Sequence, residues 1–180
     1  MKAFITFNQL REIGTKITEK RAFLEAHAAR RQYNTFLSHS SADDEFLPGI
    51  ITILENHGAV VYTDDGDDRL PEKTTPDTAK ILRTAIDDCR RFVLFVTPNS
   101  KESRWIPWEL GLSDGMKTTA AVALFPSAET WYDTTWSEQE YLGLYQRIIW
   151  GNFKDTEDNQ WMVLNHHINT AIPLRRWLEG

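Results

Sequence analysis

The chain has 180 residues, of which 41% are hydrophobic and 26% are charged, and its formal net charge is −6. This composition is typical of one globular domain rather than of a disordered chain. The negative charge argues against a nucleic-acid-binding protein, and no apolar run approaches the roughly 18 residues that a membrane span needs.

The cysteine content and the N-terminal sequence bear on where the protein acts. Cys89 is the single cysteine, so no intrachain disulfide can form. The N-terminal sequence has no long apolar stretch followed by a small-residue cleavage site, and so does not resemble a signal peptide. Both observations predict a cytoplasmic protein.

Residues 1–33 are expected to form a helical extension that precedes the main domain at 34–180. Apolar residues at helical spacing predict one or two helices over residues 5–30. Basic residues outnumber acidic ones there, and we expect a solvated basic helix on an acidic body rather than a partner-docking arm. The apolar residues with this spacing are Leu10, Ile13, Ile17, Phe23, Leu24 and Ala28.

Strands and helices alternate through the middle of the chain. Gly58 is well placed to end one helix, and Thr75 with Pro76 to begin the next. A last strand is expected near YQRIIWG (145–151) or QWMVLN (160–165), before a short helix at PLRRWLE (173–179). The other predicted strands lie at 35–40, 59–63, 91–97 and 119–125, and the other predicted helices at 43–57, 76–89 and 103–116.

This alternation predicts an α/β fold with a flavodoxin-like, doubly wound, five-stranded parallel sheet, in the order 2-1-3-4-5, and helices on both faces. TFLSHS (35–40) and RFVLFVT (91–97) are expected to be adjacent central strands, because a strand buried on both faces is apolar without alternation. Such sheets bind ligands at the carboxyl ends of the strands, where the strand order reverses. That point lies between these two strands.

Polar side chains follow the predicted strands at this point. The candidate substrate-binding residues are Ser38, His39 and Ser40 after the first strand, Asp64 after the second and Asn99 after the third. The first three could instead cap the helix that follows them.

Trp105 and Glu109 are four residues apart, which places them on one face of the helix that starts from the same edge. A carboxylate can bind ribose hydroxyls and an aromatic ring can stack on a planar base, so we expect both side chains at the pocket rim. Glu109 could instead be a surface carboxylate in the first helical turn, and Trp105 could belong to the core.

No metal site is predicted. Aspartates gather in the polar loop at 64–76, but they lack the glycine and glutamate positions of an EF-hand loop, so a solvated turn is expected. His166 and His167 are adjacent and cannot face one metal from one strand face. The loop aspartates are Asp64, Asp65, Asp67 and Asp68.

Four segments, in this order and spacing, resemble the Toll/interleukin-1 receptor (TIR) domain family. They are FLSHSSADD (36–44), the polar loop that follows VYTDD (61–65), FVTPNS (95–100) and SRWIPWE (103–109). The resemblance covers about residues 34–125. The basic N-terminal helices and the aromatic-rich C-terminal extension are similar to those of stand-alone bacterial TIR proteins, including the TIR proteins of Thoeris antiphage systems.

The resemblance implies an activity. Many TIR domains cleave the nicotinamide–ribose bond of NAD, and the glutamate of their W-x-x-x-E motif, which corresponds to Glu109, is essential. NAD would be the substrate and no separate cofactor is expected. The products would be nicotinamide and either ADP-ribose or a cyclic ADP-ribose isomer that a downstream effector could sense. The loop at 64–76 would mediate self-association, although RLPEKTTP (69–76) departs from the family's usual glycine-rich sequence.

Other functions stay open from the sequence. The main alternative is a TIR domain without enzymatic activity that only assembles with other TIR domains. A nucleoside deoxyribosyltransferase-like enzyme shares the fold and a catalytic glutamate. A phospho-receiver domain is excluded, because the strand at 91–97 ends in Thr97-Pro98-Asn99 rather than in an acceptor aspartate.

Overall fold

The computed structural model describes residues 3–16, 32–65, 67–71, 75–153 and 156–180. Its strands are β1 (Ile5–Thr6), β2 (Thr35–Ser38), β3 (Val61–Tyr62), β4 (Arg91–Val96), β5 (Val122–Ala128), β6 (Gln146–Gly151), β7 (Gln160–Asn165) and β8 (Thr170–Pro173). Its α-helices are α1 (Phe7–Thr15), α3 (Leu47–Glu55), α4 (Pro76–Asp88), α5 (Ile106–Met116) and α6 (Leu174–Glu179). Short 3-10 helices are η1 (Ser41–Phe46), η2 (Pro98–Glu102), η3 (Thr119–Ala121), η4 (Thr135–Ser137) and η5 (Glu140–Leu144).

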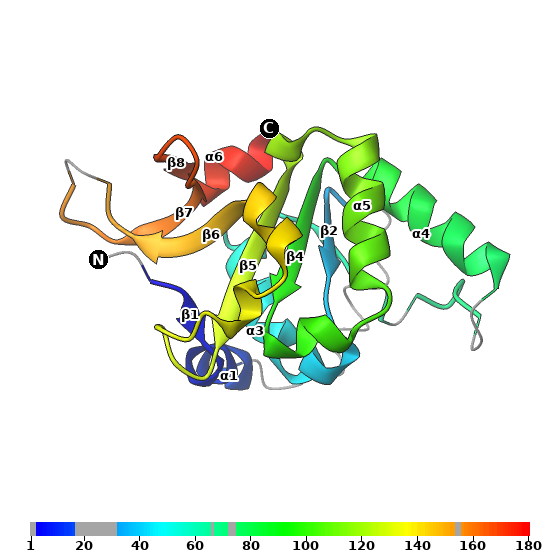
Figure 1. Cartoon of the computed structure of the whole chain (residues 1–180), viewed down its shortest axis with the longest axis horizontal. Helices are drawn as coiled ribbons and strands as arrows, with labels where there is room; N and C mark the ends of the chain where they lie inside the picture. Colours follow the sequence, from blue (N-terminus) through cyan, green and yellow to red (C-terminus); the bar gives the residue numbers. More distant parts are fainter. Residues whose placement is uncertain (1–2, 17–31, 66, 72–74, 154–155) are drawn as a thin grey trace.

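The strands form one sheet in the order β3-β2-β4-β5-β6-β7-β8 (Figure 1). The first five of these are mutually parallel, and their order is the predicted 2-1-3-4-5, with β2 and β4 adjacent at the centre. The prediction of five strands was too low, however, since the described residues contribute eight strands to the sheet. Both candidates for the last strand are real: β6 and β7 pair in antiparallel fashion, and β7 pairs likewise with β8.

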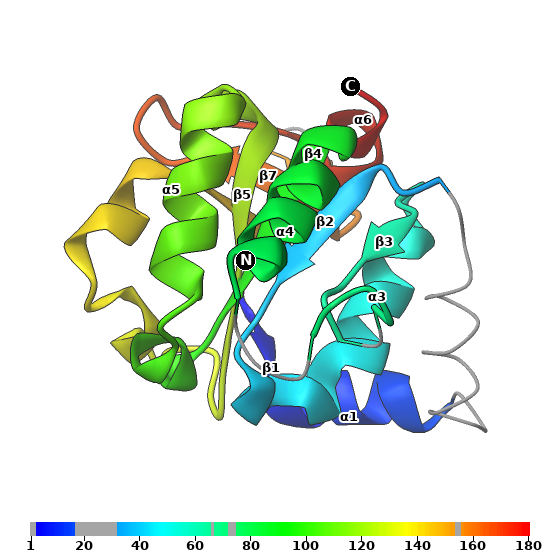
Figure 2. The same ribbon diagram turned by 90° about the vertical axis from the view of Figure 1, so that its right-hand side faces the viewer.

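Helices cover both faces of the sheet, and the side chains of β4 show the two layers. Phe92, Leu94 and Val96 pack with α4 and α5, whereas Val93 and Phe95 pack with α1, α3 and α6. Figure 2 shows α4 and α5 side by side over one face, with α3 on the other side of β2 and β3. The chain leaves β2 toward β3 through α3 and returns toward β4 through α4. With right-handed crossovers, these opposite directions place the two helices on opposite faces.

The N-terminal segment is part of this sheet. The expected helix from residue 5 is wrong for Ile5–Thr6, because β1 pairs in parallel with Ser127 and Ala128 at the end of β5. Thr6 also caps α1, since the amide of Gln9 donates to its hydroxyl and its own amide donates to the Gln9 side chain. The expected helix beyond Lys16, including Ile17, Phe23, Leu24 and Ala28, lies outside the described residues.

Helix ends follow the local sequence signals. Gly58, three residues after the end of α3, has a φ of +98°, a conformation that a glycine adopts without steric strain. Thr75 is the N-cap of α4 and Pro76 is its first residue, both as predicted, and the Thr75 amide donates to Thr78 Oγ1 at 3.0 Å. The strand expected at 59–63 forms only at Val61–Tyr62, and α5 begins three residues later than expected. Along the described ranges, no helix combines the length and the apolar character that a membrane crossing requires.

Candidate functional site

The carboxyl ends of β2 and β4 meet the first turn of α5, as the predicted strand order requires. Ser38 is the last residue of β2, and its hydroxyl donates a hydrogen bond of 2.5 Å to Glu109 Oε2. Glu109 is only 3% exposed and Ser38 only 1%. The structure therefore joins two candidate residues that are 71 positions apart in the sequence.

The local sequence of α5 explains why Glu109 points inward. Trp105 is the N-cap residue, and its carbonyl accepts a hydrogen bond of 2.9 Å from the Glu109 amide. The buried face of α5 then consists of Ile106, Glu109, Leu110 and Ser113, at the spacing of one helical stripe. Glu109 is thus a carboxylate on the buried face of the helix, a placement that ordinarily costs free energy.

Burial raises the pKa of Glu109 to about 7, and the negative charge of Asp64 acts in the same direction. The hydrogen bond from Ser38 and the charge of His39 oppose this rise. Near neutral pH, Glu109 is consequently divided between its protonated and ionised forms. Such a carboxyl group can accept a hydrogen bond or stabilise a nearby positive charge at physiological pH.

His39 lies at the centre of a second, acidic group. Its Nε2 is 3.3 Å from Asp65 Oδ2 and 3.4 Å from Asp44 Oδ1, and its Nδ1 is 3.9 Å from Asp64 Oδ1. Burial by itself lowers the pKa of His39, but the contacts with the three aspartates outweigh it and raise the pKa to about 10. The loop aspartates are therefore not simply a solvated turn. Asp67 also forms specific contacts, because it accepts hydrogen bonds from Tyr62 and Arg69.

Asp43 was missed by the sequence analysis, although it organises the same edge of the sheet. It is fully buried and accepts hydrogen bonds from Thr97 Oγ1 at 2.8 Å and from Asn99 Nδ2 at 2.7 Å. It thereby ties the residues after β2 to those after β4. Ser40 acts as the N-cap of η1, where its hydroxyl accepts from the Ala42 amide.

The remaining candidate, Trp105, is partly buried and packs with the core on the α4 and α5 side of the sheet. Its ring meets Trp108 edge to face, with 5.4 Å between the ring centroids. The structure thus brings Ser38 to Glu109 and His39 to Asp64, whereas Ser40, Asn99 and Trp105 contact structural neighbours. The missed residues Asp43 and Asp44 sit in the segment SSADD, where serines and aspartates equally signal a helix start.

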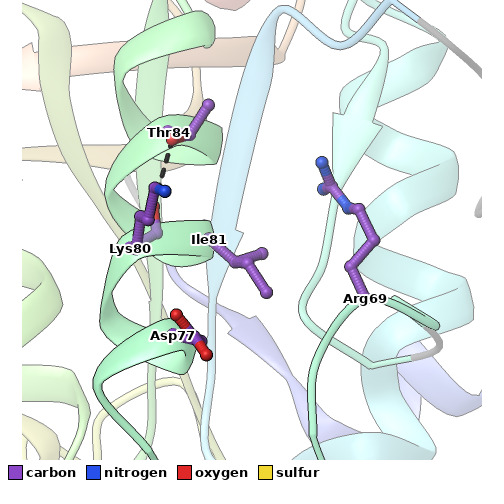
Figure 3. Close-up of a pocket in the computed structure, with 5 residues that line it drawn as sticks. All are labelled: Arg69, Asp77, Lys80, Ile81 and Thr84. Atoms are coloured by element: carbon purple, nitrogen blue, oxygen red, sulfur yellow. Dashed lines mark hydrogen bonds between the residues drawn. The ribbon is translucent and has the colours of Figure 1, made fainter.

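An open pocket of about 270 Å³ lies between α4 and the turn after β3 (Figure 3). Its lining combines two cations, Arg69 and Lys80, with Asp77, Ile81 and Thr84. None of these residues belongs to the group around Glu109. The pocket is therefore separate from the candidate site.

Comparison with known proteins identifies the fold family. The sequence profile of the TIR domain matches residues 35–162, which extends the resemblance through β6 and into β7. The chain is 34% identical over 150 residues to "Probable 3' cyclic ADP-D-ribose synthase ThsB'" of Bacillus cereus (strain MSX-D12), covering 82% of this chain and 76% of that protein. It is 30% identical over 104 residues to "Putative cyclic ADP-D-ribose synthase TIR2" of Cytobacillus dafuensis, covering 56% of this chain and 27% of that protein. Because the profile and the Bacillus relative both cover most of its length, the chain belongs to the TIR domain family.

Proposed function

We propose that the protein cleaves the nicotinamide–ribose bond of NAD and releases nicotinamide together with a cyclic ADP-ribose isomer or ADP-ribose. The observation that carries this proposal is the buried Glu109 carboxylate, bonded to Ser38 at the carboxyl edge of a TIR sheet. The names of the two relatives support the cyclic product.

The chemistry needs a negative charge at one place. Nicotinamide leaves NAD as a neutral molecule from a cationic state, so its departure requires no general acid. The ribose carbon then develops positive charge, as in glycoside hydrolysis. Ionised Glu109 would stabilise this charge and accept hydrogen bonds from ribose hydroxyls. Attack by another atom of the same nucleotide closes a ring, whereas attack by water gives ADP-ribose.

The other candidate residues have supporting roles in the proposal. Ser38 would fix the Glu109 carboxylate, and His39 and Asp64 would set the charge around it. Trp105 would offer a ring for stacking, and Ser40 and Asn99 would shape the rim, the latter through its hydrogen bond to Asp43. NAD is the substrate in this scheme, and no further cofactor takes part in the reaction.

Access to Glu109 suggests how activity is controlled. A carboxylate that is 3% exposed cannot meet a ribose unless the groups covering it move. Self-association through the loop at 64–76 would supply that movement, and turnover would then rise steeply with concentration. Leu70 packs partly buried against the core, so the exposed Pro71 is the better position at which to perturb this contact.

The biological role follows from the product. A cyclic nucleotide made in the cytoplasm from NAD would act as a signal in antiphage defence, recognised by a downstream effector. The alternative is a TIR domain that only assembles.

The test compares wild type with two variants, Glu109→Gln and Glu102→Gln. Purified proteins are incubated with NAD over a range of concentrations and under crowding, and the products are identified by mass spectrometry. Glu109→Gln should lower nicotinamide release by roughly a hundredfold or more, because one electrostatic stabiliser of a transition state is removed. Glu102 is exposed, and its variant should keep wild-type turnover. Equal rates for all three would disprove the role of Glu109, and no release from assembled wild type would favour the assembly function.

A further inference from the structure

His39, Asp64 and Asp65 form a group that the proposed reaction does not fully use. One ligand atom from each, a ring nitrogen or a carboxylate oxygen, lies within 4.8 Å of the other two. The three residues come from two segments, since His39 follows β2 and the two aspartates follow β3. The backbone therefore brings them together from different parts of the chain, 25 or more positions apart.

One ring nitrogen of the buried His39 side chain lacks a hydrogen-bond partner. The His39 side chain is only 2% exposed, and its Nδ1 has no hydrogen-bond partner. A buried polar atom without a partner is uncommon in folded proteins, and a bound ion is one arrangement that satisfies it. Nδ1 lies 3.9 Å from Asp64 Oδ1, which is too long for a hydrogen bond, whereas Asp65 contacts the other ring nitrogen, Nε2. An ion at about 2.1 Å from each atom could bridge that gap.

The charge balance also favours a cation. Asp44 is a third carboxylate beside His39, so the group stays negative even when the imidazole carries a proton. The charges that mainly act on Asp64 and Asp65 are those of His39 and of neighbouring carboxylates, among them Glu109 beside Asp64. A negative field that attracts one proton attracts a doubly charged ion more strongly.

We propose that His39 Nδ1 and Asp64 bind one divalent transition-metal ion, with Mn²⁺ or Zn²⁺ as the fitting ions, and that Asp65 orients the imidazole from its other nitrogen, Nε2. An imidazole nitrogen beside a carboxylate oxygen suits these ions, whereas Mg²⁺ and Ca²⁺ prefer oxygen ligands alone. The ion takes the place of the proton on Nδ1, Nε2 keeps its hydrogen bond with Asp65, and water completes the coordination beside the partly exposed Asp64. Its effect is to fasten the turn after β3 to the end of β2.

The experiment measures metal binding without NAD, so its outcome is independent of the proposed reaction. Metal-free wild-type protein is titrated with Mn²⁺, and free Mn²⁺ is followed by electron paramagnetic resonance. We expect one Mn²⁺ per chain. Asp64→Asn and Asp65→Asn should each weaken binding at least about tenfold, since loss of supporting groups alone costs ten- to a hundredfold. Asp68→Asn removes the same charge from the same loop but lies outside the group, and it should bind as wild type does.

A second readout identifies the nitrogen ligand. Electron spin echo spectra of the bound Mn²⁺ should show modulation from the imidazole nitrogen, and His39→Gln should abolish it. If that buried variant fails to fold by circular dichroism, Asp65→Asn decides, because Asp65 is exposed and tolerates the change. The proposal is overturned if wild type binds neither Mn²⁺ nor Zn²⁺ at about 1 mM. Equal weakening by Asp68→Asn would also overturn it, since it would show only diffuse attraction of ions to an acidic loop.

Discussion

Replacement of Glu109 by glutamine should make the folded protein more stable at alkaline pH. Burial raises the pKa of Glu109 from its usual value of 4.5 to about 7. Each pKa unit corresponds to about 1.4 kcal/mol, so ionisation of Glu109 costs the folded state about 3 kcal/mol at pH 8. Glutamine has nearly the same shape, keeps an oxygen that can accept from Ser38 and carries no charge. Its amide nitrogen needs a new partner, so we expect a net gain of about 2 kcal/mol.

The stability difference between Glu109→Gln and wild type depends on pH. A carboxyl group with a raised pKa binds its proton more tightly in the folded state than in the unfolded one. Its contribution to stability is therefore complete below pH 4.5 and disappears as the pH rises through about 7. The difference between Glu109→Gln and wild type should consequently be small at pH 5 and large at pH 8.

Urea unfolding at both pH values measures the difference, and thermal melting checks it. For a chain of this size, a gain of about 2 kcal/mol raises Tm by roughly 4–8 °C. Glu102→Gln removes an exposed carboxylate and should leave stability unchanged at either pH. The reasoning is refuted if Glu109→Gln shifts the free energy of unfolding equally at pH 5 and pH 8, or destabilises the protein at pH 8.

Four further substitutions test other parts of the structure. Ser38→Ala removes the hydrogen bond that lowers the pKa of Glu109, so the pH profile of nicotinamide release should move to higher pH. An unchanged profile would show that this hydrogen bond does not affect the pKa of Glu109. Gly49→Ala would place a Cβ 2.4 Å from a carbonyl oxygen of α1, and should cost about 1–3 kcal/mol in urea unfolding because α1 must move. Gly111→Ala meets no atom within 4 Å and should instead stabilise α5 by up to about 1 kcal/mol, so similar losses from both would contradict the packing described for α1. Asp43→Asn weakens two buried hydrogen bonds and should lower the free energy of unfolding by about 1–3 kcal/mol. An unchanged free energy of unfolding would show that these hydrogen bonds do not stabilise the fold.

The parallel core of the fold could be predicted because its sequence signals are local and strong. The run RFVLFVT has no polar residue between Arg91 and Thr97, and it forms β4 with every residue after Arg91 buried. The strands that were missed give weaker signals. β1 has only two residues and pairs with residues more than 120 positions away. β8 has an alternating burial pattern with no fully buried residue, which a periodicity analysis does not separate from a loop.

The candidate site could be predicted only in part. Strand order alone places Ser38 near Glu109, because both lie at the carboxyl edge of the sheet. The partners of His39 and Asp43 depend instead on how the loops after β2, β3 and β4 fold over that edge. Asp43 bonds to Thr97, 54 positions away, and the sequence offers no periodicity from which to infer such a contact. The role of Trp105 was open, and the ring packs against Trp108 at the start of α5.

Glu109→Gln also separates a functional residue from a structural one, because activity and stability should move in opposite directions. A residue that mainly holds the fold, such as Asp43, lowers both when it is replaced. A buried charge retained for chemistry destabilises the fold, so its removal should raise stability and abolish turnover. Glu109 meets the physical condition for the second kind, since it is a titratable group on the buried face of α5. Loss of nicotinamide release together with a higher Tm at pH 8 would therefore assign Glu109 to catalysis, and loss of both would assign it to the fold.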